Sequence, residues 1–267
     1  MLSRESSTST FPSGVKVVKA DYESLESLTN ALKGADAVLS FVGSTALGDQ
    51  NKIIDASIAA GVQRFLPSEY GSDITNAKLN SLIPVFGPKV ATIDYLKSKE
   101  SEISWSTIIT GAFFDWGLKV SFLGLDAKAK KATLIDGGES KFVTTNLRQI
   151  GRAIIKTLEQ PEKTKNQPIF VSSFVTSQKE ILAAAEKITG EKWTVENVVG
   201  KEKLNNGLEK LGKHDYSGVV DLLQATVFGD FGLADFSDKL WNEKLGLEKE
   251  DFEGSVKTGL SGKLIGE

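Results

Sequence analysis

Short apolar runs alternate with helix-like stretches between residues 15 and 110. Runs rich in Val and Ile predict strands, and apolar positions three or four residues apart predict helices. Strands are expected at Val15–Ala20, Ala35–Val42, Val62–Leu66 and Ile103–Thr110, with helices starting at Tyr22 and covering Asp49–Ala60 and Pro88–Lys99. Parallel strands buried on both faces are apolar throughout, and helices join them in right-handed crossovers. The alternation therefore predicts an α/β domain with a doubly wound parallel sheet.

The pattern loosens beyond Gly111, where a smaller lobe is expected. The prediction there is a hairpin around LIDGGES at residues 134–140, a strand at Ile169–Ser173, helices at Leu147–Leu158 and Ser177–Thr189, and a mixed, mostly helical remainder. The expected division is a dinucleotide-binding domain at residues 1–118 and a smaller substrate-binding lobe at 119–267. Residues 142–175 are expected to return to the sheet.

Composition and charge narrow the possible functions. The 267 residues carry 32 Lys and Arg against 35 Asp and Glu, a net charge of −3, which does not favour binding to nucleic acid. The absence of Cys and the single His exclude thiolate nucleophiles and make a metal site unexpected. No apolar run reaches the roughly 18 residues of a membrane-spanning helix, and the N-terminus lacks the apolar segment of a secretory signal. A cytoplasmic protein without a membrane partner is expected.

The loops after the parallel strands are the expected place for function. Ligands of open parallel sheets bind beyond the carboxyl ends of the strands, here at the loops that open at Asp21, Gly43, Pro67 and Gly111. The sequence contains no G-x-G-x-x-G turn, the usual cradle for a dinucleotide pyrophosphate. The segment Gly43–Gly48 (GSTALG) is the nearest candidate.

Four segments together resemble one family. They are QNKIIDASIAAGVQRFLPSEYGSD at residues 50–73, Phe86-x-x-Lys89, GAFFDWG at 111–117 and NQPIFVSSFVTSQKEIL at 166–182. They are similar to the isoflavone reductase and phenylcoumaran benzylic ether reductase family, within the NmrA-like atypical short-chain dehydrogenases. This resemblance implies an NAD(P)-binding Rossmann-like fold. It also implies an NADPH-dependent reductase acting on a small aromatic or secondary-metabolite substrate.

The resemblance begins at the end of the family's second strand, which Met1–Arg4 match. The family's first strand, glycine-rich turn and first helix are therefore expected to be missing. One interpretation is that Met1 is an internal methionine of a longer protein, and the other is a protein that has lost cofactor binding. Since the first Rossmann strand is central, its two neighbours are expected to have unpaired backbone groups.

Lys89 is the expected catalytic residue. It follows Pro88 in the first turn of a predicted helix, near the strand ends. The resemblance implies that the lysine of Phe-x-x-Lys is the acid/base, and the alternative is a solvated lysine at a helix start. Tyr95 and Lys99 also match the Tyr-x-x-x-Lys pair of ordinary short-chain dehydrogenases. They are expected at the surface, because they lie about 9 and 15 Å farther along the helix axis.

The other expected cofactor contacts follow the strands, and each has a second interpretation. Arg4 suits a 2′-phosphate or is an exposed terminal arginine, and Asp21 binds adenine or caps the helix from Tyr22. Gly111 and Phe113 line the nicotinamide site or pack the second lobe. Phe41, Val42 and Gly43 pass close to the cofactor or form a buried strand end.

The remaining candidates are expected to be structural or solvated. Ser68 and Glu69 are expected to be hydrogen-bonded scaffolding, His214 is expected at the surface, and the lysines of Asp126–Lys131 are expected to face solvent or to bind an acidic ligand. An NADPH-dependent oxidoreductase is the leading hypothesis. A non-enzymatic, dinucleotide-sensing NmrA-like regulator and an inactive truncated paralogue are the alternatives, and the oligomeric state is left open.

Overall fold

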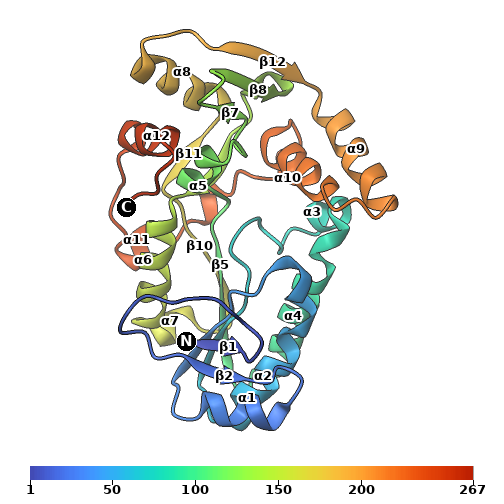
Figure 1. The fold of residues 1–267 in the computed structure, drawn as a ribbon, viewed down its shortest axis with the longest axis vertical. Coiled ribbons are helices and arrows are strands. Elements are labelled where there is room, and N and C mark those ends of the chain that lie inside the picture. The colour runs from blue at the N-terminus through green and yellow to red at the C-terminus, as the bar shows by residue number, and fades with distance from the viewer. Residues whose placement is uncertain (267) are drawn as a thin grey trace. The chain divides into compact units, whose positions relative to one another are not determined.

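The computed structural model describes residues 1–266, except for the side chains of Ser44 and Thr45. The chain divides into two compact units whose elements are labelled in Figure 1. Unit 1 comprises Met1–Glu69, Gly87–Thr107 and Glu162–Pro168, and unit 2 comprises Tyr70–Phe86, Ile108–Pro161 and Ile169–Glu267. The predicted functional division at residue 118 stays a prediction.

The first half of the chain contains most of the parallel strands. Its elements are β1 (Leu2–Arg4), β2 (Val18–Ala20), α1 (Leu25–Leu32), β3 (Ala37–Leu39), the 3-10 helix η1 (Ser44–Asp49), α2 (Gln50–Ala59), β4 (Arg64–Leu66), α3 (Ala77–Leu82), η2 (Pro84–Phe86), α4 (Gly87–Ser98), β5 (Ser104–Ile109), β6 (Ala112–Phe113), α5 (Phe114–Lys119) and β7 (Leu125–Asp126).

The second half is richer in helix. Its elements are β8 (Lys131–Ile135), η3 (Asp136–Gly138), β9 (Phe142–Thr145), α6 (Leu147–Leu158), α7 (Pro161–Thr164), β10 (Gln167–Phe170), β11 (Phe174–Thr176), α8 (Gln178–Thr189), β12 (Thr194–Val198), α9 (Gly200–Gly212), α10 (Gly218–Phe228), η4 (Ser237–Lys239), α11 (Asn242–Leu245) and α12 (Phe252–Leu260). In the part of the chain that the structure describes, no helix is long and apolar enough to cross a lipid bilayer.

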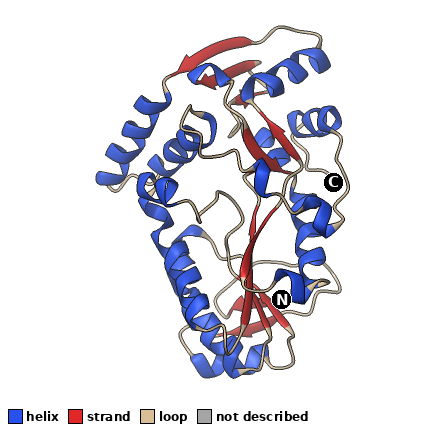
Figure 2. Ribbon diagram, turned by 180° about the vertical axis from the view of Figure 1, so that it is seen from behind, coloured by secondary structure: helices blue, strands red, loops and turns tan. Residues whose placement is uncertain are grey.

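Unit 1 contains the predicted parallel strands, drawn in red beside helices in Figure 2. β3 pairs in parallel with β4, and β4 with β5, in a sheet of order β10-β5-β4-β3. β1 and β2 form a separate parallel pair. The α/β fold is confirmed, but its strands form two sheets where one was predicted. Among the described residues β1 pairs only with β2, and β3 is an edge strand that pairs with β4.

The helices of unit 1 follow local sequence signals. α1 contacts α2, and α2 contacts α4 (Figure 1). The side chain of Ser24 accepts a hydrogen bond from the backbone of Ser27 and caps α1. The prediction that Asp21 caps a helix starting at Tyr22 is therefore wrong. Asp21 instead accepts a hydrogen bond from the backbone N–H of Glu23, at 2.9 Å, in the turn before the helix.

Unit 2 contains two three-stranded sheets, ordered β11-β9-β6 and β12-β8-β7. β8 pairs antiparallel with β7 and parallel with β12, whereas β9 pairs with β6 and β11. The predicted hairpin around LIDGGES is therefore wrong, because the strands on either side of that turn join different sheets. The hairpin of this region is β7–β8, and the lysine-rich segment Asp126–Lys131 forms its turn.

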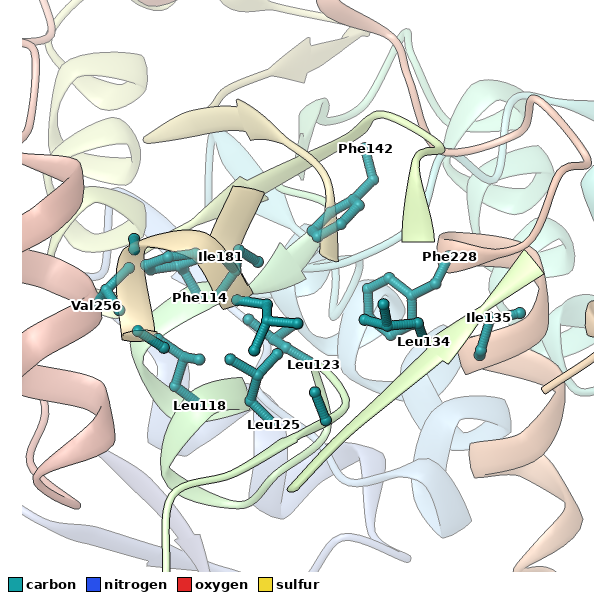
Figure 3. Packing of buried hydrophobic residues seen from close by; sticks show 14 of the residues in the cluster. Phe114, Leu118, Leu123, Leu125, Leu134, Ile135, Phe142, Ile181, Phe228 and Val256 are labelled. Carbon is teal, nitrogen blue, oxygen red and sulfur yellow. The ribbon is translucent and has the colours of Figure 1, made fainter. Parts of the chain in front are cut away.

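Aromatic and aliphatic side chains fill the interior of unit 2 (Figure 3). The rings of Phe142 and Phe228 meet edge to face with centroids 4.9 Å apart, as do those of Phe114 and Phe174. Phe114, Phe142 and Phe228 are almost completely buried. Burial of each such side chain contributes about 1.5–3 kcal/mol, so this cluster supplies much of the stability of unit 2.

Candidate active site

Lys89 and Glu69 form an ion pair at the carboxyl end of β4. Lys89 lies in the first turn of α4, as predicted, and Glu69 is the third residue after β4. The Lys89 ammonium Nζ lies 3.3 Å from Glu69 Oε2. The Lys89 side chain is 16% exposed and that of Glu69 is 0% exposed. The pair therefore has one buried end and one end that solvent or a ligand can reach.

Ser68 fixes the loop that carries Glu69. The backbone N–H of Ser68 donates to Gln50 Oε1 at 2.8 Å, and its hydroxyl donates to the carbonyl of Val42 at 3.0 Å. Gln50 is the first residue of α2 and is fully buried. These bonds join the loop after β4 to the loop after β3, and they confirm the prediction that Ser68 is scaffolding.

The prediction of a hydrogen-bonded Glu69 is wrong for its side chain. Both carboxylate oxygens are buried, and neither accepts a hydrogen bond from any described residue. Burial raises the pKa of Glu69 to about 7, and the nearby charge of Lys89 acts in the opposite direction. Desolvation dominates because a single ammonium cannot replace the water around a carboxylate. Glu69 therefore titrates close to neutral pH.

Ser40, which directly follows β3, was not among the predicted site residues. Its hydroxyl oxygen is buried and forms no hydrogen bond within the described residues. Buried polar atoms in proteins nearly always have a partner. Together with the Glu69 oxygens, the Ser40 hydroxyl therefore suits a polar ligand at the ends of β3 and β4. The serine inside the apolar run AVLSFV was the available sequence signal.

Arg4 is the last residue of β1, and Tyr22 follows the neighbouring strand β2. The Arg4 guanidinium lies over the Tyr22 ring, 5.5 Å from its centroid, and the Arg4 side chain is exposed. Burial raises the pKa of the Tyr22 hydroxyl, and the charge of Arg4 opposes this shift. A cation supported by an aromatic ring at this edge is chemically suited to a phosphate group. Asp21 is exposed beside them.

Phe41, Val42 and Gly43 follow β3, and their environments differ. The interpretation of Phe41 as part of a buried strand end is wrong, because β3 ends at Leu39 and Phe41 is 65% exposed. Val42 is partly buried and its carbonyl accepts the Ser68 hydrogen bond. Gly43 is exposed and precedes the 3-10 helix η1, which occupies most of the candidate phosphate loop Gly43–Gly48.

Gly111 and Phe113 belong to unit 2. Gly111 has φ of +63°, and a β-carbon there would lie 1.9 Å from the carbonyl oxygen of Val143. Close backbone packing against β9 therefore requires this glycine. The Phe113 ring is partly buried and meets Trp116 edge to face with centroids 6.3 Å apart. Their predicted roles as cofactor contacts stay predictions.

The remaining candidates have local roles. The Tyr95 hydroxyl donates to Asp55 on α2, and this bond raises the pKa of Tyr95 to about 12. His214 is exposed, as predicted. In the lysine-rich turn, Lys130 pairs with Glu191 and Lys131 with Glu196 at the surface.

Parallel strands covered by helices, with polar side chains gathered after β3 and β4, define a Rossmann-like α/β protein. A family model described as the NmrA-like family matches residues 3–248. The chain belongs to the NmrA-like family. The resemblance stated from the sequence is thereby confirmed.

Individual relatives agree with this assignment. Oxidoreductase aprR of Aspergillus flavus is 34% identical over 228 residues, covering 84% of this chain and 76% of that protein. The isoflavone reductase homolog IRL of Zea mays is 30% identical over 191 residues, covering 69% of this chain and 61% of that protein. The structure of a binary complex of leucoanthocyanidin reductase and NADPH from Vitis vinifera superimposes with a TM-score of 0.79 at 19% identity, covering 97% of this chain and 90% of that one. The prediction of an isoflavone reductase-like oxidoreductase is confirmed at the level of class.

Proposed function

We propose that this chain is an NADPH-dependent reductase of small aromatic or secondary-metabolite substrates, with Lys89 as the acid/base. The observation that carries the proposal is the Lys89–Glu69 pair, which holds a partly exposed ammonium beside a buried carboxylate at the end of β4. A general acid must hold a transferable proton within reach of the reacting atom. Lys89 has both the proton and the access to solvent.

The residues of unit 1 at the strand ends fit NADPH chemically. Arg4 would hold the 2′-phosphate, and the orphaned Ser40 hydroxyl and the exposed Phe41 ring would face other parts of the dinucleotide. NADPH, when bound, supplies the hydride. Asp21, Val42 and Gly43 are the further predicted contacts in this unit. The names of the maize and grapevine relatives favour a ring-containing secondary metabolite as the substrate class.

Lys89 performs the proton chemistry in this proposal. As an ammonium it donates a proton from Nζ to the substrate atom that gains negative charge during reduction. The amine left behind is reprotonated by solvent, because the Lys89 side chain is partly exposed whereas Glu69 is not. The groups around Glu69 exclude water and keep the local dielectric constant low, which strengthens the interaction between the two charges.

The test combines binding and turnover. The 267-residue chain is titrated with NADPH by nicotinamide fluorescence, and NADPH oxidation is followed with an isoflavone as the probe substrate. We expect saturable binding, and we expect Lys89→Ala to bind NADPH but to lose at least about 100-fold in kcat. Lys97→Ala is the matched control, since Lys97 is on the same helix and pairs with Asp94 at the surface.

Two outcomes contradict the proposal. If a folded sample does not bind NADPH, the proposed cofactor is wrong for this chain. Equal behaviour of wild type and Lys89→Ala, with NADPH binding but no turnover, favours the dinucleotide-sensing regulator.

A further inference from the structure

Glu69 differs from the other buried carboxylates of this chain in its lack of hydrogen bonds. Asp73 in unit 2 is also buried and also pairs with a lysine, Lys239, at 3.0 Å. Asp73 additionally accepts hydrogen bonds from the backbone N–H and the hydroxyl of Thr75. Glu69 accepts none from the described residues. The carboxylate of Asp73 therefore has hydrogen bonds as well as an ion pair, whereas that of Glu69 has only the ion pair with Lys89.

The other ionisable groups of α4, and Lys99 directly after it, have partners other than Lys89 and Glu69. Lys97 pairs with Asp94, Lys99 pairs with Glu102, and the hydroxyl of Tyr95 donates to Asp55 on α2. Among the described residues, Lys89 is the one charged side chain whose charge lowers the pKa of Glu69. The two groups therefore form an isolated ion pair at the end of β4.

We infer that Glu69 is a positioning residue that holds the Lys89 ammonium at the end of β4. This inference rests on the proposed function for its catalytic consequence. When Lys89 donates a proton, its N–H bond breaks and the substrate gains an O–H or C–H bond. A solvent proton then restores the ammonium, since the Lys89 side chain is partly exposed.

The inference also makes a statement about position that does not depend on turnover. Replacing the carboxylate by an uncharged amide removes the ion-pair partner of the Lys89 ammonium, so the side chain is no longer held at the end of β4. A lysine that is released from an ion pair is more accessible to acetic anhydride. The reactivity of Lys89 therefore reports whether Glu69 holds it in place.

The experiment is trace acetylation of wild type and Glu69→Gln at pH 8, with the labelling of Lys89 relative to Lys97 read by peptide mass spectrometry. We expect this ratio to rise about fivefold in Glu69→Gln, because the ion pair no longer holds the Lys89 side chain. Asp73→Asn is the matched control, a buried carboxylate lost from another ion pair, and it should leave the ratio unchanged. A ratio within about twofold of wild type in folded Glu69→Gln overturns the inference.

Kinetic measurements distinguish a positioning role of Glu69 from a general loss of structure. In Glu69→Gln we expect kcat to fall about tenfold with little change in KM. Glu69→Asp, which retains the charge at a greater distance, should recover part of the loss. If wild type shows no turnover, the proposed function fails while the acetylation ratio still decides the role of Glu69. If Glu69→Gln does not fold, Glu69→Ala is labelled instead, and a ratio within about twofold of wild type then overturns the inference.

Discussion

Gly111 is a residue whose identity the backbone dictates. Its φ of +63° lies in the left-handed region, and a β-carbon would overlap the carbonyl oxygen of Val143 on β9. We therefore expect Gly111→Ala to lower the free energy of unfolding by at least about 2 kcal/mol, through backbone strain and displacement of β9. Denaturant unfolding measures this. Gly48→Ala is the control, since a β-carbon at Gly48 has no neighbour within 4 Å, and an equal loss in both variants would refute the explanation.

For single residues, the sequence predicted their place in a helix or loop better than it predicted whether their side chains are buried. Pro88 and the family motif correctly placed Lys89 in the first turn of a helix at the end of a strand. The burial of Glu69 was missed, because the local sequence PSEYG is typical of a polar loop, whereas in the fold the carboxylate is buried and pairs with Lys89 of α4. The error for Phe41 was the opposite one: a buried side chain was one of the two interpretations, but the side chain is exposed. An apolar run does not show where its strand ends, and β3 ends before Phe41.

At the scale of elements, α9 and α10 approach each other through two glycines. A β-carbon on Gly207 would lie 2.8 Å from the Gly218 carbonyl oxygen and 2.9 Å from the Leu222 side chain. Gly207→Ala should therefore destabilise the protein by about 1–3 kcal/mol through overpacking. Gly212→Ala, later in α9 with no neighbour within 4 Å, should instead stabilise by about 0.5–1 kcal/mol, because alanine favours helix. Thermal unfolding of the two variants checks the opposite signs.

At this scale the helices with local signals were predicted well, whereas the pairing of the strands around LIDGGES was not. The predicted and observed bounds of α6 agree, and α8 begins after a Ser177–Glu180 capping box and ends at Gly190 in the left-handed conformation. These signals lie within a few residues of the helix ends. The strands around LIDGGES find partners far away in the chain: β8 pairs with β12 and β9 with β11. A turn motif contains no information about such pairing.

For the whole molecule, the path of the chain explains why a single domain boundary is hard to predict. The chain passes between the two units five times, after residues 69, 86, 107, 161 and 168. The short segment Glu162–Pro168 joins unit 1 through hydrogen bonds, such as that of the Ser106 hydroxyl to the Thr164 carbonyl at 2.6 Å. Asn166 likewise accepts a bond from the backbone of Trp105 at 3.1 Å. These seven residues have no strong hydrophobic periodicity, so their local sequence does not indicate that the chain joins unit 1 again here.

The stability of the whole chain should depend on pH through Glu69. Burial raises the pKa of Glu69 in the folded protein to about 7, from 4.5, so the folded state binds this proton more tightly than the unfolded state does. The resulting stability is present below pH 4.5 and is lost as the pH rises through 7, a change of about 3 kcal/mol. Carboxyls with lowered pKa values, such as Glu180 beside Lys141 and Glu186 beside Lys192, titrate below this window and have the opposite sign.

Denaturant unfolding at pH 5 and pH 8 tests this in wild type and Glu69→Gln. We expect wild type to be less stable at pH 8, and we expect most of that difference to vanish in the variant, whose amide does not titrate. A decrease of the same size in both proteins would assign the pH dependence to other groups. It would also mean that the Glu69 carboxylate is better solvated than its position at the end of β4 indicates.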